Sequence, residues 1–241
     1  MIEPKRIAMM KGKLFAACLL GGLMVAGHAS AQGAGAQDGG FLDNLLFSDA
    51  PVGKSAGHVI VRLRAMGLLP QDSSSTTSVG GHVSVSDQAG PEFDASYFLT
   101  DHIAVEAIVA STRHNVKLTG TAIGDIDVGS AWVLPPTVTL EYHFLPHKRF
   151  SPYIGAGVNV SFFYNTQANS PTINKFGIST TAGAAVKVGF DYNVCDNWFL
   201  NFDAEQIFAN ISASANTALG HVSAKDSLNP LVLSAGIGYR F

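Results

Sequence analysis

Charged residues stand at alternate positions in several segments of this chain, and they are the residues whose types and spacing could do chemistry. Arg62 and Arg64 form one such pair and Glu92 and Asp94 another, so each pair lies on one side of an extended backbone. The complete set is Arg62, Arg64, Glu92, Asp94, Glu106, Glu141, His143, Lys187, Asp191, Asp203, Glu205 and Arg240. Acids and bases enclosed in one small interior pair with each other, so the set predicts a buried ion-pair network; a narrow ion-conducting path is the alternative.

Catalysis and metal binding are the other chemistries open to such residues. Glu141 and His143 share one face, and with a serine they could form the catalytic group of a lipid-modifying enzyme. Both side chains are expected to point into an interior rather than toward lipid, so we predict no enzyme. The histidines at positions 102, 114, 143 and 147 lack the spacing of metal ligands, so neither a metal nor a cofactor is expected.

The elements that must position these residues are β-strands, because eight segments alternate apolar residues with polar or small ones at a period of two. The segments cover residues 58–69, 91–100, 102–112, 137–145, 152–164, 177–194, 198–209 and 231–241. Each is close to or longer than the roughly 9–11 residues that a tilted strand needs to cross a bilayer. Eight is an even number, as expected for a closed antiparallel barrel in the bacterial outer membrane.

The links between these segments alternate in length. Short links lie around Asp101, at 146–149 and at 196–197, and they contain Asp, Asn and Pro, which tight turns prefer. The long links are residues 70–90, 113–136, 165–176 and 210–228. Short periplasmic turns and long extracellular loops are typical of outer-membrane barrels, so this asymmetry indicates which end of the barrel faces outward.

Periodicity alone also fits a soluble barrel of lipocalin type with its apolar face inward. The aromatic residues favour the membrane, because they gather at the strand ends on the apolar face, as interfacial girdles do. Those near the short turns are Tyr97, Tyr142, Phe144, Tyr192, Trp198, Tyr239 and Phe241, and those near the long links are Phe162, Tyr164 and Phe208. We therefore predict an all-β, eight-stranded antiparallel up-and-down transmembrane β-barrel with the charged residues in its lumen. Eight strands exclude a wide aqueous pore.

The first 31 residues have the pattern of a secretory signal peptide: a basic start, an apolar stretch from Leu14 to Gly27, and a small-residue cleavage site ending at Ala31. Cleavage would leave 11 basic and 17 acidic residues, a net charge of −6 that argues against nucleic acid as a partner. Residues 32–56 are expected to be a flexible Gly-rich arm, or to dock at the barrel mouth through Phe41–Phe47. Residues 57–241 form the predicted barrel.

Three segments carry a family resemblance. They are Leu134-Pro-Pro-Thr-Val-Thr-Leu-Glu-Tyr-His-Phe144, Phe150-Ser-Pro-Tyr-Ile-Gly-Ala-Gly-Val-Asn159, and Asn229-Pro-Leu-Val232 with the closing Gly238-Tyr-Arg-Phe241. In this order they resemble the OmpW family of Gram-negative outer-membrane proteins over about residues 57–241. The resemblance implies an eight-stranded barrel that binds or passes small hydrophobic compounds. It also implies that Tyr239 and Phe241 form a signal for the barrel-assembly machinery. The arm and the serine-rich first loop depart from the family pattern.

Apolar residues near the long links suggest how a barrel with a filled lumen could handle such a compound. Leu68, Leu69, Leu118, Ile123, Trp132, Val133 and Leu134 are expected to line a hydrophobic funnel at the extracellular end. Pro70, Pro91, Pro135 and Pro136 lie near the same rim, where missing N–H groups weaken strand pairing. The hypothesis is entry through the funnel and lateral exit into outer-membrane lipid; plain strand termination is the alternative role for the prolines.

A second function from another class remains open on the sequence. The long links, among them the Ser/Thr/Gly tract from Gln71 to Gly90, suit a surface receptor or adhesion protein for which the barrel is only an anchor. Both hypotheses place the protein in the outer membrane of a Gram-negative bacterium.

Overall fold

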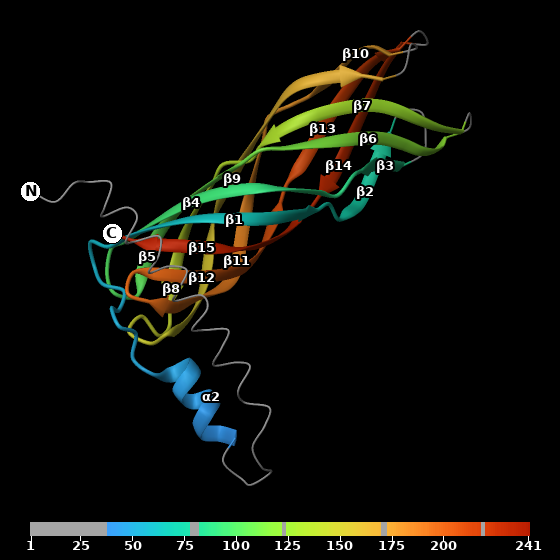
Figure 1. Ribbon diagram of the computed structural model, residues 1–241. Coiled ribbons are helices and arrows are strands. Elements are labelled where there is room, and N and C mark those ends of the chain that lie inside the picture. Colours follow the sequence, from blue (N-terminus) through green and yellow to red (C-terminus); the bar gives the residue numbers. More distant parts are fainter. Residues whose placement is uncertain (1–37, 78–81, 122–123, 170–172, 218–219) are drawn as a thin grey trace, which may run out of the picture.

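A computed structural model describes residues 38–77, 82–121, 124–169, 173–217 and 220–241, and the predicted cleavage site at Ala31 and the funnel residue Ile123 lie outside them. A short helix, α2 (Asp38–Phe47), precedes a series of antiparallel strands (Figure 1). No helix among the described residues is long and apolar enough to cross a membrane.

Eight strands close into a barrel, and the predicted fold class is confirmed. These strands are β1 (Val59–Leu69), β4 (Gln88–Phe98), β5 (Ile103–Ala110), β8 (Thr137–His143), β9 (Phe150–Ala168), β11 (Thr181–Cys195), β12 (Trp198–Phe208) and β15 (Leu231–Arg240). They pair in chain order, β9 pairs with β11, and β15 returns to β1 with Val61 opposite Tyr239. Each strand overlaps one of the eight alternating segments, because the requirement for an apolar outer face fixes both register and length.

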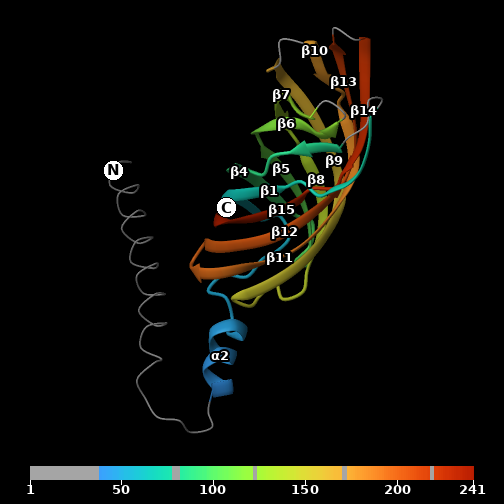
Figure 2. The ribbon, with the colours of Figure 1, turned by 90° about the vertical axis from the view of Figure 1, so that its right-hand side faces the viewer.

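The long links differ from the prediction, since most of their described residues form strands rather than loops. These strands are β2 (Asp72–Thr77), β3 (His82–Val85), β6 (Thr112–Thr121), β7 (Gly124–Leu134), β10 (Ile173–Ile178), β13 (Asn210–Thr217) and β14 (Gly220–Leu228). One group, β7-β6-β3, joins the barrel through β9, and the other forms a sheet in the order β10-β13-β14-β2. Both continue the barrel beyond one end (Figure 2), and we call this part the extension. The backbone groups of these links find partners across the hairpins, so low β-propensity does not prevent pairing.

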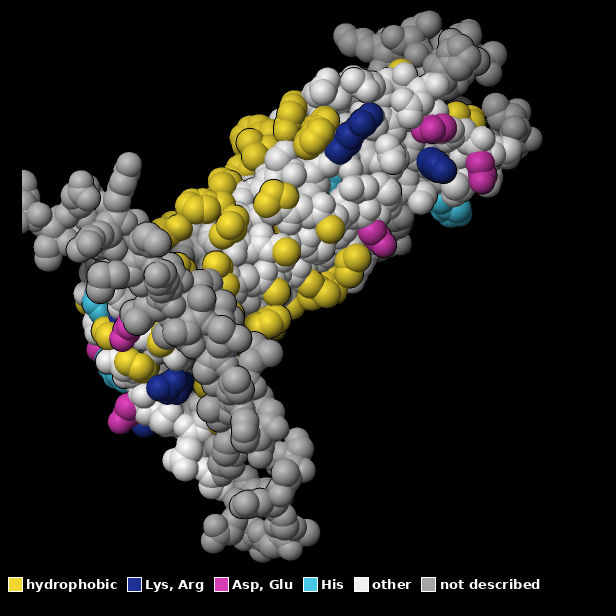
Figure 3. All heavy atoms as spheres, viewed as in Figure 1, with side chains coloured by type: hydrophobic (Ala, Val, Ile, Leu, Met, Phe, Trp, Pro, Cys, Tyr) yellow, Lys and Arg dark blue, Asp and Glu magenta, His cyan; other side chains and the backbone are white. Residues whose placement is uncertain are grey.

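The barrel has its apolar residues outside and its polar residues inside. Leu63, Leu140 and Val158 on the outer face are 58%, 56% and 62% exposed, whereas Arg62 and Glu106 on the inner face are fully buried. Apolar side chains are spread over the visible barrel surface, and charged side chains gather at the end with the short turns and on the extension (Figure 3). Such an outer face is stable only where lipid replaces water as the solvent.

Inward-facing glycines make room for the long cationic side chains of the interior. Gly238 lies opposite Arg62, Gly236 opposite Arg64 and Gly155 opposite Lys187 in the strand register. A Cβ atom at Gly238 or Gly155 would lie 2.9 Å from the Cγ atom of the facing cation. A narrow barrel can therefore hold these cations only because the facing positions carry no side chain.

Candidate functional site

Arg62 is the centre of the ion-pair network that fills the middle of the barrel. Its guanidinium lies 2.8 Å from Asp94 Oδ1, 2.9 Å from Asp191 Oδ2 and 3.3 Å from Glu106 Oε1. It also donates a hydrogen bond of 2.7 Å to Ser96 Oγ. All these side chains are fully buried, so the charges compensate one another rather than facing water.

Arg64 and Lys187 extend this network. Arg64 contacts Glu92 at 2.7 Å and Asp94 at 2.9 Å, and it also pairs with Asp203. Lys187 pairs with Glu106 and, at 3.0 Å, with Glu141 Oε1. Every predicted lumen charge, namely Arg62, Arg64, Glu92, Asp94, Glu106, Glu141, Lys187, Asp203, Glu205 and Arg240, is at most 9% exposed. The interior around Arg62, Arg64 and Lys187 is filled by buried side chains that are paired with these three cations.

Lys54 closes the network at the end of the barrel with the short turns. It belongs to the segment before β1, yet its side chain is only 1% exposed and enters the barrel. Its ammonium group lies 2.8 Å from Asp191 Oδ2, 2.9 Å from Ser151 Oγ and 2.9 Å from His143 Nδ1. A cation delivered from outside the strands thus completes the interior charge pairing.

The backbone around Lys54, which we call the strap (residues 48–57), is fastened across this mouth. Lys54 N donates to Pro146 O at 2.8 Å, and Arg240 donates to the carbonyl oxygens of Val52 and Gly53, both at 2.6 Å. Arg240 therefore lies at the mouth and binds the strap. The strap also has a G-x-S-x-G run at residues 53–57, but it ends in a turn that leads into β1 and is not the strand-to-helix turn of a hydrolase nucleophile.

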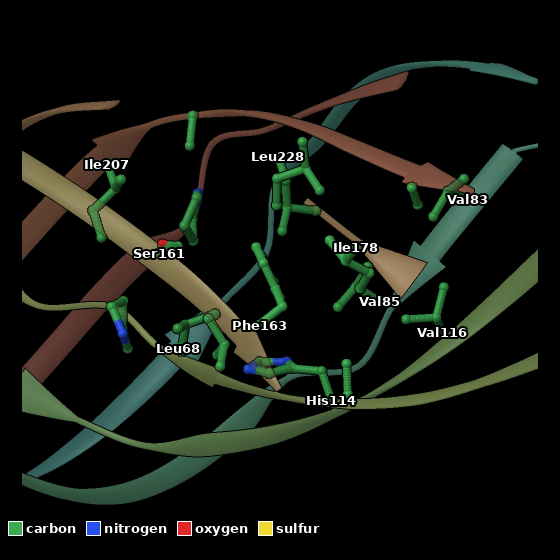
Figure 4. Close-up of a pocket in the computed structure, with 17 residues that line it drawn as sticks. Leu68, Val83, Val85, His114, Val116, Ser161, Phe163, Ile178, Ile207 and Leu228 are labelled. Carbon is green, nitrogen blue, oxygen red and sulfur yellow. The ribbon is translucent and has the colours of Figure 1, made fainter. Parts of the chain in front are cut away.

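An apolar cavity of about 90 Å³ lies where the barrel passes into the extension (Figure 4). Its lining residues are Leu68, Val83, Val85, His114, Val116, Ala131, Val133, Pro135, Ser161, Phe163, Ile178, Ile207, Ala209, Ile211, Ala213, Leu228 and Pro230. Only His114 and Ser161 among them carry polar side chains. The volume is several times the roughly 10–15 Å³ that a water needs, which suits a short alkyl chain or a small ring.

The structure places only some of the predicted funnel residues at this cavity. Leu68 and Val133 line it. Leu118 is buried on the same strand face as Val116 but does not line the cavity. Leu69, Trp132 and Leu134 lie on the opposite faces of their strands, where Trp132 stacks on Tyr164 at 6.2 Å and Leu134 is 37% exposed. Neighbouring strand residues cannot face one cavity together.

Pro135 and Pro136 interrupt strand pairing beside the cavity. The register between β5 and β8 ends with Ile108 opposite Thr137, and that between β6 and β7 begins with Thr112 opposite Val133. Among the described residues, no paired position joins 109–111 to 134–136. A proline has no N–H to donate, which explains the gap in this ladder.

A side-chain bond crosses this ladder gap on the outer face, where the Ser111 and Tyr164 hydroxyl groups are hydrogen-bonded at 2.7 Å. Inside, the fully buried Asn159 donates from Nδ2 to Pro135 O at 3.1 Å and to Thr137 Oγ1 at 2.8 Å. These Asn159 bonds join β9 to residues 135–137, on the side away from the gap, and fix the proline edge in place.

The other two predicted prolines have different surroundings. Pro91 lies inside β4 opposite Ala65, one residue beyond the point where pairing between β4 and β5 ends at Glu92–Ala110. Pro70 lies between β1 and β2. Neither lines the cavity, so Pro135 is the one of the four that lies both at the cavity and at a break in the ladder.

Several residues of the site were missed by sequence reasoning. Ile207, Ala209, Ile211 and Ala213 all line the cavity from β12, β13 and the junction between them, and their spacing of two in the sequence predicts that they share one face. Lys54 gave no signal, because its partner Asp191 is 137 residues away.

His114 is the titratable residue of the cavity. Its Nδ1 lies 2.9 Å from Ser86 O and its Nε2 lies 2.9 Å from Thr112 Oγ1. Burial lowers the pKa of His114 below its ordinary value of 6.5, although the Ser86 carbonyl and Asp87 oppose the shift. The ring is therefore neutral at pH 7 and keeps the cavity uncharged.

A closed eight-stranded barrel with a lipid-facing apolar belt and a charged, filled lumen defines the class of outer-membrane β-barrel proteins. The OmpW family model matches residues 55–241, and the chain belongs to the OmpW family. In this class the short turns are periplasmic and the extension is extracellular. The protein is thus located in the outer membrane of a Gram-negative bacterium.

Individual relatives agree with this assignment. The chain is 44% identical over 183 residues to the outer-membrane protein y4mB of Sinorhizobium fredii, covering 75% of this chain and 79% of that protein. It is 32% identical to outer membrane protein W of Vibrio cholerae, covering 80% and 94% of the two chains. The crystal structure of OprG from Pseudomonas aeruginosa superposes with a TM-score of 0.74 at 25% identity, covering 78% and 98%.

Proposed function

We propose that the protein binds small hydrophobic solutes in the extracellular cavity and releases them sideways into the outer membrane through the ladder gap at Pro135-Pro136. The observation that carries the proposal is the position of the cavity. It lies directly beside the gap, because Val133 and Pro135 line the cavity and lie at the edge of the gap. An apolar solute that leaves water for such a cavity gains the usual free energy of apolar burial.

The route toward the periplasm is unsuitable for an apolar solute. Below the cavity the barrel holds the buried charges centred on Arg62, and below those Lys54 and the strap cover the mouth. A solute on this path would have to separate ion pairs in a region of low dielectric, at a cost of several kcal/mol per ion. The sideways path through the gap needs the release of the Ser111–Tyr164 hydrogen bond.

A relative's name supports a hydrophobic solute. A Pseudomonas aeruginosa protein that is 29% identical over 163 residues is named dibenzothiophene metabolism operon protein PahQ. Dibenzothiophene is an apolar aromatic molecule, and the proposal extends this solute class to the present chain.

Solute binding can be tested with a charge placed inside the cavity. Val116 lines the cavity, and its neighbour Asn115 is exposed on the outer face of the same strand. In liposomes or nanodiscs, Val116→Asp is expected to abolish most uptake of a hydrophobic fluorescent probe, whereas Asn115→Asp leaves uptake unchanged. Equal uptake by both variants would show that the cavity does not take the solute.

The sideways exit can be tested by covalent closure of the gap. Continuing the register places Ser111 opposite Leu134 in the gap, and Asn115 opposite Ser130 in the intact ladder above it. A disulfide in the variant Ser111→Cys, Leu134→Cys is expected to block probe transfer into the bilayer but not probe binding, and reduction restores transfer. The matched pair Asn115→Cys, Ser130→Cys should transfer normally when oxidised. Undiminished transfer through the closed gap would require another exit.

A further inference from the structure

The helix α2 has an apolar face that the barrel leaves exposed. Leu42, Leu45 and Leu46 lie on one side of this helix, because their spacings of three and four residues match its period, whereas Asn44 lies on the opposite side. Leu42 is 54% exposed and Leu45 is 37% exposed. A helix of ten residues is too short to persist in water without support. Its apolar face therefore needs a surface that covers it.

The C-terminal end of α2 is fastened to the barrel at the level of the aromatic residues near the short turns. The hydroxyl of Tyr192 donates to Leu45 O at 3.1 Å. Tyr192 lies on the lipid-facing side of β11, because both of its neighbours on this strand are buried inside the barrel. Directly after the helix, Arg149 N donates to Ser48 O at 3.0 Å. From this end α2 runs across the direction of the barrel strands in Figure 1, and so follows the membrane surface rather than the barrel axis.

We infer that α2 lies in the periplasmic surface of the outer membrane and buries its leucine face among the acyl chains of phospholipids. Lipid is the occupant because this face continues a surface that already contacts lipid. Tyr192 belongs to the girdle that borders the apolar belt of the barrel, and it holds the helix at that level. An interfacial helix places its apolar side about 5–10 Å deep, at the boundary between headgroups and acyl chains. The helix thereby anchors the strap, which follows it directly, to the membrane.

The charge of α2 decides how it is held in the lipid. It contains Asp38 and Asp43 and no lysine or arginine. Many interfacial helices use a basic face to bind anionic headgroups, and this attraction is weakened by salt. α2 has no such attraction, so burial of the leucine face must supply its affinity. Its insertion is therefore expected to be the same in zwitterionic and anionic bilayers and at low and high salt.

The experiment uses the unmodified chain, purified from outer membranes with labelled leucine methyl groups and placed one copy per lipid nanodisc. A nitroxide on the lipid acyl chain near the headgroup is expected to relax the Leu42 methyl signals at least about threefold more than a gadolinium chelate in the water does. The side-chain amide of Asn44 should show the reverse order. Stronger relaxation of Leu42 by the chelate would place this face in water and overturn the inference.

The other possible occupants give different results in the same experiment. Weak relaxation of Leu42 by both probes would mean that protein covers the face, and relaxation by the lipid probe only in discs with two copies would mean that a second copy is needed. Either result would overturn the inference. A requirement for anionic lipid would overturn the argument that apolar burial alone holds the helix.

One substitution at two positions tests the leucine face directly. In nanodiscs, Leu42→Asp is expected to raise the hydrogen-exchange rates of the α2 amides by roughly tenfold, since a buried leucine is lost and a charge must enter lipid. Asn44→Asp adds the same charge on the water side and should leave these rates unchanged. The amides of β11 and β12 report in both variants that the barrel is folded. Equal α2 rates in the two variants would show that lipid does not hold this face.

Discussion

The membrane barrel and the extension have opposite polarities on continuous strands. Along β12 and β13 the inward residues change from Asp203 and Glu205 to Ile207 and Ala209, while the outward residues change from Phe202 and Phe208 to polar ones such as Ser212. The same reversal occurs from β5 to β6. The difference follows from the surrounding solvent, since lipid requires an apolar outer face and water permits an apolar interior.

This reversal determines where a solute can bind. In the barrel the apolar side chains face lipid, so the charged and polar side chains face the interior. In the extension the inner face becomes apolar, and the cavity lies at the boundary. The ladder gap lies at the same level, because the outer face changes there from the exposed Val109 to Ser111, with Leu134 and Phe162 on the neighbouring strands. A solute leaving through the gap would therefore enter lipid at the top of the apolar belt.

The largest expected effect concerns the charged interior. Arg62→Met removes the cation shared by Asp94, Glu106 and Asp191. These three buried carboxylates then keep only their other cationic partners, Arg64, Lys187 and Lys54. The free energy of unfolding is expected to fall by about 3–5 kcal/mol in a denaturant titration of the detergent-solubilised barrel. Leu63→Met, on the lipid-facing side of the same strand, should cost less than about 1.5 kcal/mol. Similar losses for the two variants would contradict the network's role.

The polarity boundary itself can be tested with one substitution at two levels. Phe202→Lys places a charge on the outer face of the barrel, and Ser212→Lys places it on the outer face of the extension. The first is expected to lower the free energy of unfolding in lipid by about 2–4 kcal/mol, and the second by about 0–1 kcal/mol. A large loss for Ser212→Lys would mean that the apolar belt reaches further outward than we infer.

The sequence predicted the barrel well because lipid imposes a strict alternation on every membrane strand. It predicted the extension poorly, since Ser, Thr and Gly in 210–217 and 220–228 resemble loop composition, and only cross-strand pairing supplies the order. The funnel prediction grouped neighbours such as Val133 and Leu134, which strand geometry separates. It also omitted Ile207 and Ala209, although their spacing of two predicts that both side chains lie on one face of a strand. Lys54 could not be found, because nothing near a single lysine in the arm indicates a distant carboxylate.

A smaller effect on stability is expected at the strap, which covers the charged interior of the barrel. Lys54→Met removes a buried cation that contacts Asp191, but Arg62 still pairs with this carboxylate. We expect a loss of about 1.5–3 kcal/mol in unfolding free energy and a rise in ion conductance in planar bilayers. The control is Lys148→Met, whose exposed pair with Asp49 is screened by solvent and contributes little to stability. Unchanged conductance in Lys54→Met would mean that the strap is not the seal.

The smallest expected effect is the pH dependence of stability and of probe binding at the apolar cavity. Burial lowers the pKa of His114 below 6.5, so between 6.5 and the lowered value the unfolded chain binds a proton that the folded chain does not. Stability contributed by His114 is therefore full above 6.5, declines as pH falls through this window, and levels off below the folded pKa. Probe binding should weaken only when pH falls through the folded pKa, because the charge then enters the cavity. His114→Phe is expected to remove both dependences; a pH profile of probe binding unchanged by this substitution would place the titrating group elsewhere.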